Sequence, residues 1–133
     1  MNEFEKTICS MDFNFFGTGK HKIDAATFLA SPEAILLDVR ATEETSTIKL
    51  CLKHHLPVIE IPFSELPSKI DQLPKDKFIG VFCSSGVRSA ITFAYLKSNG
   101  FENVKMIEGG YPQLVEAIMP GKIFKHINMV INN

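Results

Sequence analysis

The sequence predicts an α/β fold in which a mainly parallel central sheet is flanked by helices on both faces. Along its 133 residues, short apolar runs typical of strands alternate with segments that carry helix start and stop signals, as in folds built from strand–helix–strand units. The runs 34–39 and 78–82 are apolar almost throughout, which is the pattern of strands covered on both faces. In such sheets the functional site lies beyond the carboxyl ends of the strands.

Helix signals lie between the predicted strands. Asp24 is a typical N-cap for the first helix, and Ser64 for the second, which Pro74 stops. Asn99 and Gly100 form a C-terminal stop for the third helix. The predicted strands are residues 34–39, 58–61, 78–82 and 104–107, and the predicted helices are residues 24–30, 64–73, 89–98 and about 112–118.

The chain is predicted to form one domain, residues 23–120, with an extension at each end. Residues 1–22 are predicted to be irregular, with three phenylalanines packed on the edge of the domain; an exposed patch that binds a partner is the alternative. Residues 121–133 are predicted to form a helix whose apolar face packs on the domain, and a dimer contact is the alternative. The apolar and polar residues of 127–131 could also alternate in the pattern of a strand. The apolar residues concerned are Phe13, Phe15 and Phe16, and Ile123, Phe124, Ile127, Val130 and Ile131.

Composition argues against several classes of function. The chain carries 14 basic and 15 acidic residues, a formal net charge of −1, so we expect neither a nucleic acid nor a membrane as partner. No apolar run approaches the roughly 20 residues of a membrane span, and the acidic N-terminus is unlike a signal peptide. Three widely spaced cysteines argue against a disulfide framework and for a reducing compartment, so we expect a cytoplasmic protein.

The loop from Cys83 to Arg88 is the most informative segment of the chain. It connects a predicted strand to the start of a predicted helix, where backbone N–H groups converge and the helix dipole is positive. Such a position lowers the pKa of a thiol and holds an anion beside it. Gly86 tolerates positive φ, so that the backbone can curl around a ligand, and Arg88 adds a permanent positive charge.

The loop therefore predicts a nucleophilic cysteine in an anion-binding cradle. The alternative is a buried, inert cysteine at a strand end with a surface arginine nearby. The predicted site consists of Cys83 as the nucleophile, Ser84, Ser85, Gly86, Val87 and Arg88 as the anion-binding loop, and Ser89 as the cap of the following helix.

Four segments occur in an order that is found in a known family. They are residues 37–40 (LDVR), 55–66, 83–88 and 107–111. Together they resemble the single-domain rhodaneses, or rhodanese-like sulfurtransferases, from residue 35 to about residue 118. The resemblance implies the rhodanese-like α/β fold. Residues 41–53 differ from the family's pattern, so no contact is assigned there.

The resemblance also implies an activity, the transfer of sulfane sulfur through a persulfide on Cys83. The donor would be thiosulfate, a small sulfur-bearing anion, or a persulfide, and the acceptor a thiol or a sulfur-carrying protein. Arg88 would pair with the oxyanion end of the donor. Asp38 and Arg40, at the end of a predicted strand, would support the loop. No metal and no organic cofactor would be needed.

Two other functions remain open at this stage. A cysteine phosphatase or an arsenate reductase would also hold an oxyanion with a cysteine and an arginine, but those enzymes separate the two by five residues, whereas four separate Cys83 from Arg88. Phe82 also stands where tyrosine phosphatases usually have histidine. A non-catalytic binding or sensor module is the second alternative, and the intact cysteine argues against it.

The remaining cysteines and histidines support weaker hypotheses. Cys51, His54 and His55 could suggest a metal site, but three potential ligands without a distant partner favour an ordinary loop with a packed His55. Cys9 or Cys51 could resolve a disulfide with Cys83, although ordinary thiols are the preferred interpretation.

Overall fold

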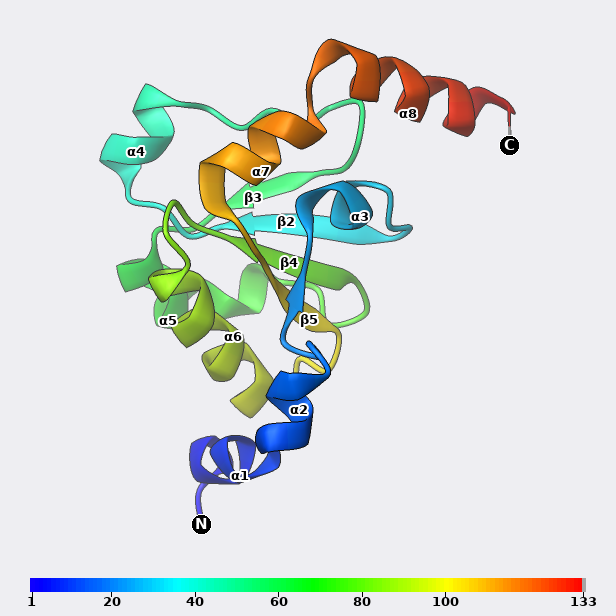
Figure 1. Ribbon diagram of the computed structural model, residues 1–133. Coiled ribbons are helices and arrows are strands. Elements are labelled where there is room, and N and C mark those ends of the chain that lie inside the picture. Colours follow the sequence, from blue (N-terminus) through cyan, green and yellow to red (C-terminus); the bar gives the residue numbers. More distant parts are fainter. Residues whose placement is uncertain (133) are drawn as a thin grey trace.

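A single parallel sheet forms the centre of the molecule (Figure 1). The computed structural model describes residues 1–132, with side chains up to Met129. Five strands lie in the order β1-β5-β4-β2-β3, and every neighbouring pair is parallel. They are β1 (Lys22–Ile23), β2 (Ala34–Asp38), β3 (Val58–Glu60), β4 (Phe78–Phe82) and β5 (Val104–Ile107). The predicted fold class is confirmed.

Helices cover both faces of the sheet because the central strands are apolar on both sides. Successive residues of a strand point to opposite faces, so Leu36 packs in one hydrophobic core and Leu37 in the other. The first core is closed by α3 (Ala25–Leu29) and α7 (Gly110–Ala117), and the second by α5 (Leu66–Lys69) and α6 (Val87–Ser98).

The predicted central strands agree with the structure to within one residue at each end. Asp24 caps α3 as predicted, since its side chain accepts a hydrogen bond from the backbone N–H of Thr27. The continuous helix predicted from Ser64 is wrong. Two 3₁₀ turns flank the short α5, and no side-chain hydrogen bond caps it. Pro67, three residues after Ser64, has no N–H that the Ser64 hydroxyl could accept as an N-cap.

The prediction that residues 1–22 are irregular is also wrong. They contain α1 (Glu3–Ser10) and α2 (Phe13–Gly17), whose N-caps Asn2 and Asp12 accept backbone N–H groups, and the start of β1. Phe15 packs on Phe93 of α6, with ring centroids 6.2 Å apart, whereas Phe13 is 91% exposed. Only part of the predicted aromatic packing is therefore present.

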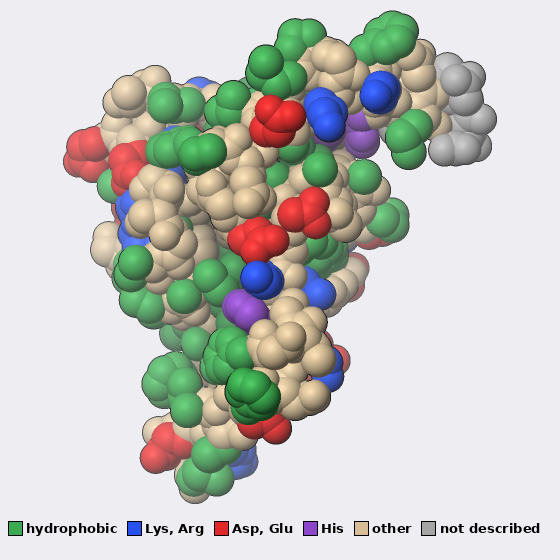
Figure 2. Space-filling model, viewed as in Figure 1, with side chains coloured by type: hydrophobic (Ala, Val, Ile, Leu, Met, Phe, Trp, Pro, Cys, Tyr) green, Lys and Arg blue, Asp and Glu red, His purple; other side chains and the backbone are tan. Residues whose placement is uncertain are grey.

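The C-terminal extension is a helix, α8 (Pro120–Asn132), which points away from the sheet (Figure 1). Its described side chains are exposed or half-buried, and His126 stacks on His55 with ring centroids 4.2 Å apart. Figure 2 shows hydrophobic side chains at the surface over α8 and over the N-terminal helices. The side chains of Val130 and Ile131 lie outside the described residues. Within residues 1–132, no helix has the length and hydropathy needed to cross a membrane.

A glycine pair at the start of α7 lies against the loop that follows β4. Gly109 and Gly110 have φ of +89° and +57°, values that L side chains rarely adopt. A Cβ atom on Gly110 would lie 2.5 Å from the backbone oxygen of Ser84. The backbone of the loop can therefore approach α7 this closely only because residue 110 has no side chain.

Replacing Gly110 by alanine should destabilise the fold and shift this loop. We expect the Gly110→Ala variant to lose about 1–3 kcal/mol in the free energy of unfolding, from the clash and the positive φ together. Urea denaturation measures the loss. The control is Gly121→Ala in α8, where a Cβ meets nothing within 4 Å and the change should stay within about 0.5 kcal/mol. Equal stability of the two variants would contradict the close approach.

Candidate active site

Cys83 follows β4 directly and lies at the carboxyl edge of the sheet, as the sequence predicts. The chain then turns at Gly86, whose φ of +92° is left-handed, and enters α6 at Val87. A Cβ at position 86 would meet no atom within 4 Å, so it is the backbone conformation that requires glycine there. This turn points the N–H groups at the start of α6 back toward the cysteine.

Backbone donors surround the sulfur of Cys83. The N–H groups of Gly86 and Ser89 donate hydrogen bonds to Sγ at donor–sulfur distances of 3.0 and 3.3 Å. Burial alone would raise the pKa of the thiol, since Cys83 is 1% exposed. The hydrogen-bond donors of Ser89, Ser85 and Gly86 outweigh that effect, so that the pKa lies below its ordinary value. The arrangement favours a thiolate at the floor of the loop.

The prediction that Ser89 caps the helix is wrong. The N-cap is Gly86, because its left-handed conformation lets α6 begin two residues earlier than the sequence predicts. Ser89 therefore lies inside the first turn, fully buried. Its hydroxyl makes no hydrogen bond of regular geometry within the described part of the chain, yet it is near enough to Sγ to lower the pKa of Cys83.

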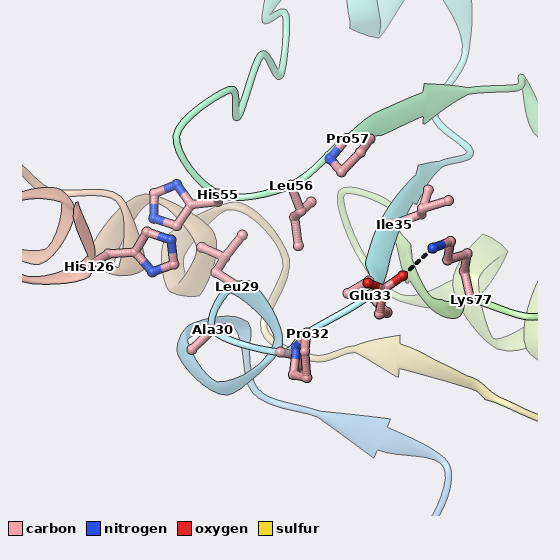
Figure 3. A pocket seen from close by; sticks show the side chains of 12 residues that line it. Leu29, Ala30, Pro32, Glu33, Ile35, His55, Leu56, Pro57, Lys77 and His126 are labelled. Atoms are coloured by element: carbon pink, nitrogen blue, oxygen red, sulfur yellow. Dashed lines mark hydrogen bonds and ion pairs between the residues drawn. The ribbon is translucent and has the colours of Figure 1, made fainter. Parts of the chain in front are cut away.

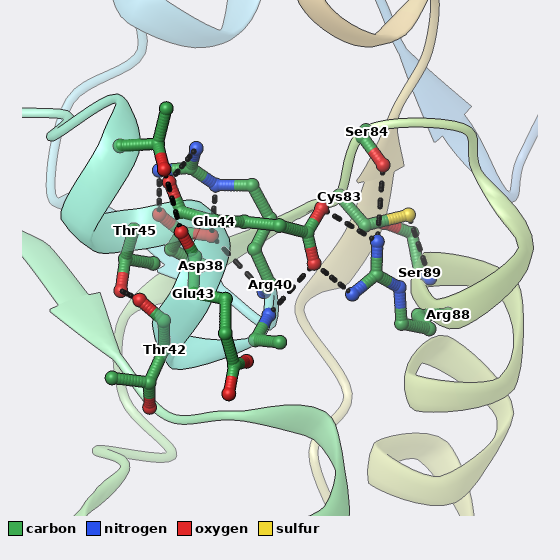
Figure 4. A network of polar contacts seen from close by, with 12 residues as sticks. Asp38, Arg40, Thr42, Glu43, Glu44, Thr45, Cys83, Ser84, Arg88 and Ser89 are labelled. Carbon is green, nitrogen blue, oxygen red and sulfur yellow. Dashed lines mark hydrogen bonds and ion pairs between the residues drawn. The ribbon is translucent and has the colours of Figure 1, made fainter.

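Arg88 is held by a carboxylate that the sequence analysis did not assign (Figure 4). It donates from Nη1 and Nη2 to the two carboxylate oxygens of Glu44, at 2.6 and 3.0 Å, and from Nη2 to the Ser84 hydroxyl at 3.0 Å. Glu44 lies on α4 (Thr42–Thr47) and also accepts the N–H of Ala41 at 3.0 Å. The hydrogen bonds from Arg88 and then from Ala41 lower the pKa of Glu44 to about 2. The carboxylate is therefore ionised at neutral pH.

A buried ion pair lies beside the loop. Arg40 and Asp38 are both 0% exposed, and their side chains meet through two hydrogen bonds, from Nη2 at 2.7 Å and from Nε at 2.9 Å. Arg40 also donates to the Tyr111 hydroxyl at 3.0 Å and to the backbone oxygen of Ile48 at 2.8 Å. The hydrogen bonds to Asp38 raise the pKa of the Arg40 guanidinium above its ordinary value. A buried pair of charges is tolerated when it is satisfied in this way, and this one ties β2, α4 and α7 together.

Sequence reasoning missed Glu44 and Tyr111. The sequence contains only weak signals for these two residues. Glu44 is one of two acidic residues in a first helical turn, where negative charge interacts favourably with the helix dipole. Tyr111 carries a hydroxyl beside the paired glycines. The structure brings Cys83, Ser84, Arg88 and Ser89 together, whereas the side chain of Val87 is 65% exposed.

A hollow of the surface lies away from this loop (Figure 3). It has a volume of about 510 Å³ and includes Ala34 and Lys77, which stand at the amino ends of β2 and β4. Because the strands are parallel, this edge of the sheet is opposite the edge that carries Cys83. Its lining residues are Leu29, Ala30, Ser31, Pro32, Glu33, Ala34, Ile35, His55, Leu56, Pro57, Lys77 and His126.

The other two cysteines differ from Cys83 in exposure. Cys9 and Cys51 are exposed, and all three cysteines are free thiols. Within residues 1–132, no three His, Cys, Asp or Glu side chains form a group that could hold a metal ion.

Known proteins of the same kind match most of the chain. The family model of the rhodanese-like domain matches residues 23–117. A tRNA sulfurtransferase from Actinobacillus succinogenes is 36% identical over 88 residues, which are 66% of this chain and 18% of that protein. The chain thus spans less than a fifth of the length of this curated relative.

Solved structures agree with this match. A rhodanese-related protein from Thermoplasma volcanium is 32% identical, with a TM-score of 0.64 over 75% of this chain and 95% of that one. A NAD-dependent persulfide reductase from A. fulgidus is 40% identical, with a TM-score of 0.51 over 60% of this chain and 14% of that one. Since the family model covers well over half of the residues, the chain belongs to the rhodanese-like sulfurtransferase family.

Proposed function

We propose that this protein carries sulfane sulfur as a persulfide on Cys83. It takes the sulfur from thiosulfate or from a persulfide donor and passes it to a thiol or to a sulfur-accepting protein. The observation that supports this most directly is the position of Sγ, which accepts N–H groups from Gly86 and Ser89 at the start of α6. A thiolate is the form of cysteine that attacks sulfur.

The reaction is a nucleophilic displacement at sulfur. The Cys83 thiolate attacks the outer sulfur of thiosulfate, a new S–S bond forms, and the old S–S bond breaks with its electron pair leaving on sulfite. An acceptor thiolate then attacks the outer sulfur of the persulfide and regenerates the Cys83 thiolate. Charge is conserved in both steps, and neither needs an oxidant or a reductant.

The same donors would stabilise each form of the cysteine. The N–H groups that hold the thiolate are fixed by the turn at Gly86 and do not have to reorganise during the reaction, which is how fixed dipoles favour a charged transition state. In the ionised persulfide, the outer sulfur carries the negative charge in place of Sγ. The buried Ser89 hydroxyl, which lacks a regular partner among the described residues, is a further donor for it.

Phosphate chemistry fits the loop less well. The predicted cradle has four residues between Cys83 and Arg88, and a shorter loop makes a smaller ring of N–H groups. Arg88 is also paired with Glu44, whereas a phosphate would need the guanidinium for itself.

We further propose that the protein works in the cytoplasm, since its cysteines are free thiols, as is usual in a reducing compartment.

Replacing the nucleophile should abolish sulfur transfer and leave the fold intact. We expect the Cys83→Ser variant to form no persulfide, because a hydroxyl cannot replace the thiolate, while its free energy of unfolding changes by less than about 1.5 kcal/mol. Cyanolysis of sulfur loaded on the purified protein measures the persulfide. The matched controls, Cys9→Ser and Cys51→Ser, remove exposed thiols and should keep full loading.

Two results would contradict the proposed function. One is full persulfide loading of the Cys83→Ser variant, which would place the chemistry on another group. The other is brisk hydrolysis of an aryl phosphate by the unmodified protein without any persulfide, which would make phosphate the substrate.

A further inference from the structure

The only basic residue of the loop is already paired. Among residues 83–88, Arg88 alone is basic, and it is held by both oxygens of Glu44. We propose that Glu44 makes this loop select a persulfide of a small organic thiol as the sulfur donor and disfavour thiosulfate. This inference rests on the proposed sulfur transfer at Cys83 and adds the class of donor to it.

The charges at the site argue against a dianion. The Cys83 thiolate and the ionised Glu44 contribute two negative charges, and Arg88 contributes one positive charge. The next arginine, Arg40, is fully buried and neutralised by Asp38. Thiosulfate would bring two more negative charges close to a site that is already negative, whereas a thiol persulfide brings at most one on its sulfur, and like charges at short range repel.

Exposed apolar side chains occur in and directly after the two helices that carry Arg88 and Glu44. Val87 and Ile91 are 65% and 52% exposed, and they stand four residues apart in α6, which places them on one face of the helix. Ile48, at the end of α4, is 50% exposed. The carbon skeleton of an organic persulfide can contact such side chains, whereas thiosulfate has no carbon atoms.

The transfer balances without any added reagent. The Cys83 thiolate attacks the outer sulfur of R–S–SH and forms a new S–S bond. The S–S bond of the donor breaks, its electron pair leaves on the thiolate R–S⁻, and the proton stays on the transferred sulfur. One negative charge is consumed and one is released, so the total charge of the site stays the same, and no dianion has to enter or leave.

Glu44→Gln is the direct test, because glutamine keeps the shape and removes the charge. The two donors are thiosulfate and the persulfide of 2-mercaptoethanol, which can carry a charge only on its sulfur. The unmodified protein should show a kcat/KM at least about tenfold higher for the persulfide, a difference of about 1.4 kcal/mol. In the Glu44→Gln variant, kcat/KM for thiosulfate should rise about tenfold. The ratio of kcat/KM for thiosulfate to kcat/KM for the persulfide should rise severalfold.

Glu43→Gln provides the matched control. Glu43 is the neighbouring residue in α4, it is exposed, and it points away from Arg88 in Figure 4. The change removes the same charge, so both values of kcat/KM should stay within about twofold, as expected for a screened surface charge.

A salt series on the unmodified protein tests the same claim without any variant. Added salt screens repulsion between charges, so kcat/KM for thiosulfate should rise with ionic strength relative to that for the persulfide. Equal use of both donors, a parallel change of both in the Glu44→Gln variant, or no relative rise with salt would overturn the inference and leave sulfur transfer standing. A protein that takes sulfur from neither donor would instead contradict the proposed function.

Discussion

The hydrogen bonds from the backbone of Gly86 and Ser89 to the sulfur of Cys83 are the interaction on which the rest of the site depends. They require a strand that ends at the cysteine, a left-handed turn at Gly86 and a helix that begins at once. The parallel sheet provides the first condition, and the glycine provides the second. Tight packing of Gly110 on the backbone of Ser84 then holds the loop from its other side.

Two ion pairs surround this thiolate and differ in their physical role. Arg40 and Asp38 are fully buried and satisfied by several partners, so they hold neighbouring elements in place and add no net charge. Glu44 and Arg88 are each more than a quarter exposed, and Arg88 ends the loop that begins at Cys83. In our proposal the second pair is the one that selects between donors, since the Glu44 carboxylate neutralises the only basic side chain among residues 83–88.

The parts of the fold that the sequence predicts are those with strong local signals. The apolar runs of β2, β4 and β5 and the loop with Cys83 and Gly86 could be read directly. The start of α6 could not be predicted, because it depends on the φ of Gly86, which the sequence does not specify. The pairing of Arg88 with Glu44 joins residues 44 positions apart, and no pattern of hydropathy or spacing marks such a pair. The helices α1 and α2 were missed because their caps stand in a short, polar-rich segment.

A titration of the Cys83 thiol tests the central claim, that backbone donors hold a thiolate against the cost of burial. The rate of alkylation by iodoacetamide is measured against pH in a protein with Cys9→Ser and Cys51→Ser, so that only Cys83 reacts. Our account predicts that the thiol titrates below the ordinary pKa of a free cysteine, in line with the hydrogen bonds to its sulfur. A pKa at or above the ordinary value would show that burial dominates and would contradict the account.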